Sequence, residues 1–132
     1  MKYLLDTNIC IYIIKKKPEN VIKKFLKTKP DSICISSITV SELYFGVAKS
    51  SKPNENTIAL EKFIFPLTII DFNKEDSIAY GKLRAKLEQK GKLIGAMDML
   101  IAAQAISRDL VLITNNEKEF IKIDGLIIEN WI

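Results

Sequence analysis

In the sequence Tyr3-Leu4-Leu5-Asp6-Thr7-Asn8, a short apolar run is followed by three polar residues. Residues 2–5 suit a buried strand, and the polar side chains that follow can accept hydrogen bonds from the free N–H groups at the start of a helix. Short apolar strands that alternate with helices are typical of a parallel sheet with helices on both faces. This segment therefore predicts a strand-to-helix unit of an α/β fold.

Further apolar runs and helical patterns continue this alternation along the chain. We expect strands at residues 2–5, 32–36, 67–70, 110–113 and 126–128. We expect helices at 8–16, 19–28, 55–65, 74–89 and 96–108, a short helical turn at 117–120, and one helix that is capped by Ser37 or Thr39 and runs to about residue 50. The sequence thus predicts a single domain of residues 1–132 with a parallel sheet of about five strands.

The composition narrows the chemistry that such a domain can perform. A chain of 132 residues is long enough to bury its own core. It has no histidine, which excludes Ser-His-Asp and Cys-His nucleophiles, histidine general bases and the usual zinc sites with imidazole ligands. The two cysteines, Cys10 and Cys34, lie in apolar runs, so we expect buried free thiols. Any enzyme activity would therefore depend on carboxylates.

No part of the sequence has the pattern of a membrane span or a signal peptide. Asp6, Lys15 and Arg108 interrupt the apolar stretches well before the roughly 18 residues that a span requires. The apolar part of the N-terminus is too short for a signal-peptide core, and no small-residue cleavage site follows it. We expect a soluble, cytoplasmic protein without a membrane partner.

Three acidic residues stand near the carboxyl ends of predicted strands. Asp6 follows the first strand, Glu42 lies within one turn of the start of the helix after the second, and Asp98 lies in the first turn of a nearly apolar helix. Ligand sites of parallel sheets lie beyond these strand ends. Two carboxylates about 5 Å apart repel by roughly 3 kcal/mol at an effective dielectric constant near 20, and a divalent cation would relieve that repulsion. The pattern predicts a site for Mg²⁺ or Mn²⁺.

Each acid also has a simpler interpretation. Asp6 would be an ordinary helix cap, Glu42 a solvated surface acid, and Asp98 an acid that favours the positive end of its helix. Several other acids are interpreted as surface or capping residues, namely Asp71, Glu75, Asp76, Glu117 and Glu119. Only the three acids taken together point to a site.

The formal charge of +4 arises from 20 basic and 16 acidic residues. The basic residues cluster at 15–17, 23–29 and 82–92. Basic clusters around a few acids suit a phosphate-backbone ligand, because lysines attract the polyanion while the carboxylates hold a cation that contacts it. A solvated, lysine-rich surface has the same composition, so both interpretations stay open.

Four short motifs occur in order between residue 3 and Trp131. They are Leu5-Asp6-Thr7-Asn8, Ser37-x-x-x-Ser41-Glu42-Leu43-x-x-Gly46, Asp98-x-x-Ile101-Ala102-Ala103 and Thr114-Asn115-Asn116-x-x-Glu119-Phe120. Together they resemble the PIN-domain ribonucleases, in particular the VapC toxins of bacterial toxin-antitoxin pairs. The resemblance implies a PIN-like domain and Mg²⁺- or Mn²⁺-dependent endonucleolytic cleavage of structured RNA such as transfer RNA, which would inhibit translation.

The resemblance also assigns roles to residues by position. Asp6, Glu42 and Asp98 would be the catalytic, metal-binding acids, and Thr114 would support bound water. Asn116 stands where many relatives have a fourth acid, and Asn8 and Asn116 are expected to support the site. An amide oxygen can ligate a metal but adds no negative charge, so Asn116 argues against a tightly held second ion.

The partners that the resemblance implies are a cognate antitoxin and a second copy of the toxin. The antitoxin would form a hetero-oligomer with the toxin, cover its groove and present a basic side chain to the acids. The apolar run Ile9 to Ile14 and the pair Tyr44-Phe45 suit these interfaces and the core equally well.

Other classes of protein fit the sequence less well. A receiver-type phosphoacceptor has an acidic pair after its first strand, and an Asp-x-Asp phosphatase has a second aspartate two residues on, whereas this chain has Asp6-Thr7-Asn8. A non-catalytic RNA-binding or antitoxin-binding module with a degraded metal site stays open as an alternative, because Asn116 is not an acid.

Overall fold

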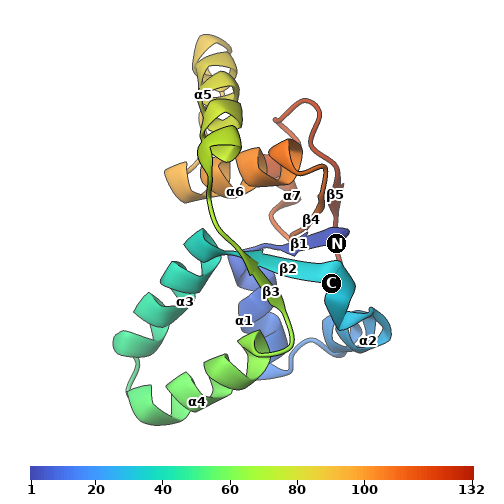
Figure 1. The fold of residues 1–132 in the computed structure, drawn as a ribbon, viewed down its shortest axis with the longest axis vertical. Helices are drawn as coiled ribbons and strands as arrows, with labels where there is room; N and C mark the ends of the chain where they lie inside the picture. The colour runs from blue at the N-terminus through green and yellow to red at the C-terminus, as the bar shows by residue number, and fades with distance from the viewer.

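A parallel sheet forms the centre of the computed structural model, which describes residues 1–132 (Figure 1). Its strands are β1 (Tyr3–Leu5), β2 (Ile33–Ser36), β3 (Thr68–Ile70), β4 (Val111–Ile113) and β5 (Ile128–Glu129). They lie in the order β3-β2-β1-β4-β5, and every neighbouring pair is parallel. The carboxyl ends of all the strands therefore face the same edge of the sheet.

Helices cover both faces of this sheet. They are α1 (Thr7–Lys15), α2 (Glu19–Lys27), α3 (Ser37–Ala48), α4 (Pro53–Ile64), α5 (Lys74–Gln89), α6 (Ala96–Ser107) and α7 (Glu117–Phe120), with a 3₁₀ turn at Pro30–Ser32. In Figure 1, α5 and α6 lie above the sheet, whereas α1, α2 and α4 lie below it. None of these helices combines the length and the apolar character that crossing a membrane requires.

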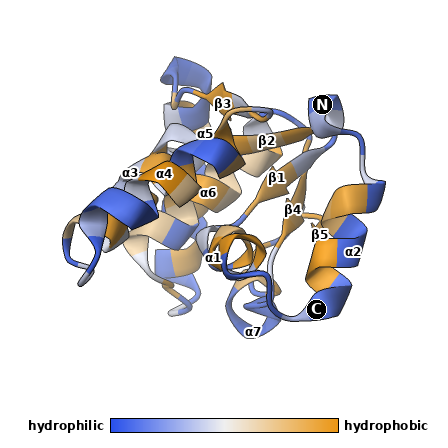
Figure 2. Ribbon diagram, turned by 90° about the horizontal axis from the view of Figure 1, so that it is seen from below, coloured by the Kyte–Doolittle hydropathy of each residue, from blue (hydrophilic) through white to orange (hydrophobic).

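The two faces of the sheet carry separate hydrophobic cores, because successive side chains of a strand point to opposite faces. Leu4 and Leu112 pack with residues of α5 and α6 on one face. Leu5 and Ile113 pack with residues of α1 to α4 on the other. Figure 2 shows the consequence for α2, which is apolar on its inner side and polar on its outer side. The two cysteines are free and buried, as predicted.

The predicted α/β fold, with a parallel sheet of five strands and helices on both faces, is confirmed. The predicted position of the last strand is wrong by two residues at its start. The ladder pairs Leu112 with Ile128 and Ile113 with Glu129, so β5 begins at Ile128 rather than at Leu126. Leu126 packs against a core cluster just after the turn at Gly125, whose φ is 83°. The apolar run therefore begins before the strand does.

The start of α3 also differs from the prediction. Its N-cap is Ser36, whose hydroxyl accepts a hydrogen bond from the Ile38 N–H at 3.1 Å. Capping by Ser37 or Thr39 is therefore wrong, because the last residue of β2 already provides the cap. Thr39 is instead fully buried, and Glu42 lies in the second turn of the helix rather than the first.

A buried ion pair joins α5 to the end of α6. The carboxylate of Asp76 is fully buried and accepts from Arg108 Nη2 at 3.1 Å and from Arg108 Nε at 3.4 Å. It also accepts from the Asn73 N–H at 2.9 Å and from Gln104 Nε2 at 3.3 Å. Burial alone would raise the pKa of Asp76, but the hydrogen bonds from Arg108 and Asn73 hold it below the ordinary value of 3.8. Asp76 is a capping residue, as predicted, but it is not on the surface.

Candidate active site

Asp6 is the residue at which β1 ends and α1 begins. Its backbone N–H donates to the Ile113 carbonyl of β4 at 2.9 Å, which extends the strand pairing to the start of the helix. An N-cap carboxylate usually accepts from an N–H two or three residues on. Asp6 Oδ1 accepts instead from the adjacent N–H of Thr7 at 2.9 Å, and Oδ2 accepts from Thr114 Oγ1 at 2.8 Å. A capping role alone therefore does not explain how this carboxylate is held.

Thr114 connects the end of β4 to Asp6. Its side chain is fully buried, and its hydroxyl donates to Asp6 and accepts from the Asn116 N–H at 2.9 Å. Its own backbone N–H donates to the Glu129 carbonyl of β5 at 3.0 Å. Asn116 thus enters the site through its backbone, and its half-buried side chain makes no hydrogen bond within the chain.

Thr7 brings Glu42 to the same edge of the sheet. The Thr7 hydroxyl donates to Glu42 Oε1 at 2.7 Å and lies 3.2 Å from the hydroxyl of Thr39. Glu42 is half-buried on α3, so it is not the solvated surface acid of the simpler interpretation. Asp6 and Glu42, from different elements, are therefore linked through one threonine.

Asp98 lies in the first turn of α6, as predicted, and is half-buried. The pKa of Asp98 is raised from the ordinary 3.8 to about 6. Burial is the largest cause, and the negative charges of Asp6, Glu42 and Glu119 add to it. Burial also raises the pKa of Asp6, and the charge of Glu42 adds to that effect while hydrogen bonds from Thr114 and Thr7 oppose it. The three predicted acids therefore lie close enough for their charges to interact.

The negative charge of these acids is not neutralised within the chain. The ion pairs of the protein involve other acids, and none includes Asp6, Glu42 or Asp98. No three Asp, Glu or Cys side chains are gathered tightly enough to hold a metal ion between them. A set of negative oxygen donors without a basic partner fits Mg²⁺, which binds through one or two carboxylates and keeps several waters.

Glu119 is a functional candidate that the sequence interpretation placed on the surface. It is half-buried, its charge acts on Asp98, and it pairs with Lys122 at 3.4 Å. Its neighbour Phe120 is fully anchored in the core, which fixes the short helix α7 beside the site. The signal was present in the motif that joins Thr114 to Glu119, but a charged residue on a short helix resembles any other surface acid.

Asn8 stands apart from this network. It is exposed in the first turn of α1, and its side chain makes no hydrogen bond within the chain. The preceding residue, Thr7, makes the hydrogen bonds to Asp6 and Glu42 instead. No local sequence pattern separates Thr7 from Asn8, because both residues suit the start of a helix.

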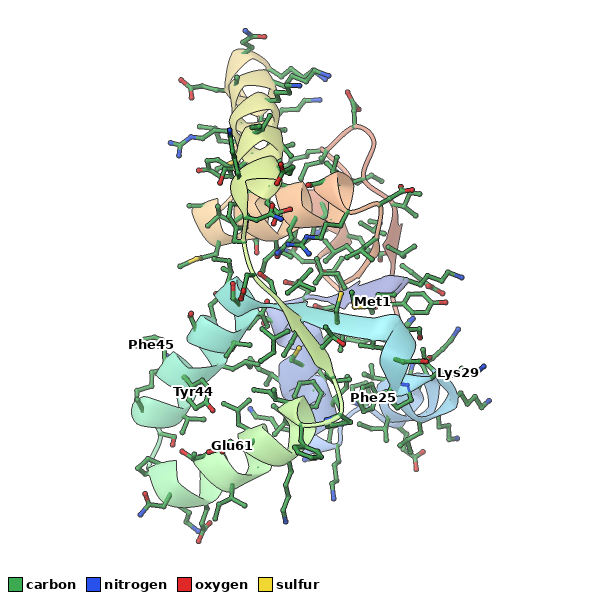
Figure 3. The ribbon with its side chains drawn as sticks, viewed as in Figure 1. Met1, Phe25, Lys29, Tyr44, Phe45 and Glu61 are labelled. Carbon is green, nitrogen blue, oxygen red and sulfur yellow. The ribbon has the colours of Figure 1, made fainter.

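A groove of about 400 Å³ lies between α1, α3 and α4 and includes Glu42 in its wall. Ile11 and Ile14 line this groove, whereas Ile9 belongs to the core. The apolar run of α1 therefore contributes to both the core and the groove. Phe45 is 66% exposed and projects from the outer side of α3 (Figure 3). The groove therefore offers an apolar surface that includes the Glu42 side chain.

Comparison with models of protein families identifies the family of this chain. The model described as PIN domain matches residues 3–126, a range that contains all the acids described above. The chain belongs to the PIN-domain family. The resemblance inferred from the sequence motifs is thereby confirmed.

Similar PIN-domain proteins carry the name VapC. Ribonuclease VapC2 of Rickettsia felis is 48% identical over 132 residues, which cover 99% of this chain and 98% of that protein. The tRNA(fMet)-specific endonuclease VapC of Salmonella typhimurium is 44% identical over 131 residues, which cover 99% of this chain and 98% of that protein. This PIN domain is therefore a VapC-type domain.

Solved structures of PIN domains agree with this fold. The DNA-bound VapBC structure from Salmonella typhimurium matches with a TM-score of 0.95 at 43% identity, covering 100% of this chain and 99% of that chain. VapBC2 from Rickettsia felis, bound to a DNA fragment from its promoter, matches with a TM-score of 0.93 at 47% identity, covering 100% of both chains. The sheet and helices of this PIN domain thus follow those of VapBC structures along the whole chain.

Proposed function

We propose that this PIN-domain protein is the toxin of a toxin-antitoxin pair and cleaves RNA endonucleolytically with bound Mg²⁺ or Mn²⁺. One observation carries the proposal: Thr7 links Asp6 and Glu42 at the carboxyl edge of the sheet, their charges act on Asp98, and none of the three acids has a basic partner. The names of the VapC relatives, ribonuclease and endonuclease, support it. The absence of histidine from the sequence is compatible with this chemistry, because a bound cation would lower the pKa of its water, so that no histidine base is needed to deprotonate it.

The roles of the residues follow from their contacts. The carboxylates of Asp6, Glu42 and Asp98 would hold the cation either directly or through its bound waters. When bound, the cation would supply an activated water and stabilise charge on the leaving oxygen. Thr114 keeps Asp6 Oδ2 in place, since its hydroxyl is itself fixed by the Asn116 N–H. The charge of Glu119 next to Asp98 would add to the attraction for the cation.

The proposed substrate is structured RNA, and transfer RNA in particular, because the Salmonella relative is named a tRNA(fMet)-specific endonuclease. Exposed basic side chains form two tracts that suit a phosphate backbone. One tract lies on α2 and the turn before it, and the other on the second half of α5 and the turn after it. Cleavage of transfer RNA would inhibit translation in the cytoplasm.

The proposed protein partner is a cognate antitoxin, because the matching structures are VapBC complexes. The groove between α1, α3 and α4 supports this assignment, since a segment that fills it would come within reach of Glu42. A basic side chain of that segment would compete with the cation for the acids. A toxin homodimer stays a prediction, with the exposed Phe45 and Tyr44 as candidate contacts.

Metal removal tests the proposed reaction. We expect the purified protein to cut an end-labelled transfer RNA at internal positions with Mg²⁺ or Mn²⁺, to stop when EDTA removes the cation, and to resume when Mn²⁺ is added back. Cleavage that persists in EDTA would contradict the cation requirement. Binding of the RNA without cleavage in either cation would favour the alternative, a non-catalytic binding module with a degraded site.

The raised pKa of Asp98 predicts a pH dependence in two measurements. The cation must displace a proton from Asp98 below about pH 6, so we expect Mn²⁺ affinity to fall as the pH drops through this value. In the cation-free protein the folded state binds this proton more tightly than the unfolded state, whose pKa is near 3.8. Stability should therefore rise as the pH falls from 6 to 3.8, relative to Asp98→Asn. Urea unfolding of both proteins would show this, and parallel pH profiles would contradict it.

A further inference from the structure

Thr7 contacts two of the three acids at once. Its backbone N–H donates to Asp6 Oδ1 at 2.9 Å, and its hydroxyl donates to Glu42 Oε1 at 2.7 Å. No other residue of the chain donates hydrogen bonds to more than one of the three acids. The relative placement of these carboxylates, which come from different elements, therefore depends on Thr7.

The Thr7 hydroxyl is itself held in position. The Thr39 hydroxyl lies 3.2 Å from it, and Thr39 is fully buried with no other side-chain hydrogen bond. An ionised carboxylate only accepts, so the single hydroxyl proton of Thr7 goes to Glu42 and Thr39 donates to Thr7. Thr39, Thr7 and Glu42 thus form a short chain of hydrogen bonds, and the last of these bonds is charge-assisted.

We propose that Thr7 is a positioning residue, which sets the orientation of the Asp6 and Glu42 carboxylates and thereby the affinity of the site for its divalent cation. Thr7 holds Glu42 through Oε1, and Oε2 makes no hydrogen bond within the chain and stays free as a ligand. This inference rests on the proposed function, because that function supplies the cation. Removal of a residue that orients a metal ligand typically lowers metal affinity or activity about 10- to 100-fold.

A purely structural role of Thr7 predicts something different. Thr7 is the first residue of α1, where its backbone N–H serves Asp6 whatever its side chain is. Thr7→Val keeps that N–H and the branched shape and removes only the hydroxyl. Thr7→Ser keeps the hydroxyl and removes only the methyl group. If Thr7 only starts the helix, valine should be tolerated at least as well as serine.

The test compares Thr7→Val, Thr7→Ser and Thr39→Val with wild type, using calorimetric titration with Mn²⁺, single-turnover RNA cleavage and thermal unfolding without cation. Thr57→Val is the matched control, because the Thr57 hydroxyl donates only to a carbonyl within α4. We expect Thr7→Val to lose about 10-fold or more in Mn²⁺ affinity and in cleavage rate, Thr39→Val to lose less, and Thr7→Ser to stay within about threefold of wild type.

Several outcomes would overturn the inference. Thr7→Val with the affinity of wild type would do so, and so would Thr7→Ser with a loss as large as that of Thr7→Val. A wild type that binds no Mn²⁺ would also overturn it. A wild type that binds Mn²⁺ but cuts no RNA would refute the proposed function alone, and the affinity comparison would still decide the role of Thr7.

Discussion

The Asp6→Asn protein is expected to stay folded and to lose RNA cleavage by at least about 100-fold. Asparagine keeps the size of the side chain and an acceptor for the Thr7 N–H, but it brings no charge to the cation. Because burial raises the pKa of Asp6, its ionised form weakens the cation-free fold, and its neutralisation should not lower stability. Single-turnover cleavage of a labelled transfer RNA and thermal unfolding in EDTA measure the two effects.

Asp31→Asn is the control for this substitution, since Asp31 is an exposed acid in the 3₁₀ turn before β2. It should leave both cleavage and unfolding unchanged. A cleavage rate of Asp6→Asn within about threefold of wild type would contradict a ligand role for Asp6, because loss of a catalytic group lowers the rate far more than this. A large drop in its thermal stability would show that the fold depends on the second carboxylate oxygen of Asp6, which accepts from Thr114.

The Arg108→Met protein is expected to be less stable than wild type by about 3 kcal/mol, because it leaves the charge of Asp76 buried without its partner. The side chain of Asp76 is 0% exposed, and its carboxylate accepts hydrogen bonds from Nε and Nη2 of Arg108. The lowered pKa of Asp76 gives the sign of the pH effect. The pair stabilises the fold above pH 3.8, and this contribution is lost as the pH falls through the folded-state pKa.

Urea unfolding of the single and double variants measures this energy. Asp76→Asn combined with Arg108→Met should recover part of the loss, because no unpaired charge then stays buried. Arg84→Met is a matched control, since Arg84 is an exposed arginine of α5 that contacts only Tyr80. Equal stability of Arg108→Met and Arg84→Met would show that the ion pair contributes nothing.

The sheet could be predicted from the sequence because each strand is a short apolar run followed by a helix start. β1 is the clearest case, since Leu4 and Leu5 point to opposite cores and both must be apolar. The last strand was predicted less well because Leu126, Ile127 and Ile128 are equally apolar. Only pairing with β4 decides that Ile128 enters the ladder and Leu126 does not.

The sequence motifs single out Asp6, Glu42 and Asp98 as candidates, whereas the residues that surround these acids could not be predicted. Asp6, Glu42 and Asp98 each follow a recognisable change from apolar to polar sequence. The roles of Thr7 and Thr39 depend on how α1 and α3 meet, which no local pattern encodes. The environments of Asp76 and Glu119 could not be predicted from local sequence, because Arg108, which pairs with Asp76, and Asp98, on which the charge of Glu119 acts, lie far away along the chain.

The hydrogen bond between Thr114 and Asp6 spans 108 positions of the chain, because the central strand β1 is synthesised first and β4 nearly last. A nascent chain on the ribosome carries Asp6 and Glu42 long before β4 can pair with β1. Until then the carboxylate of Asp6 lacks both Thr114 and the backbone contact to Ile113. The Asp6 carboxylate therefore reaches its final environment only near the end of synthesis, when β4 has joined the sheet.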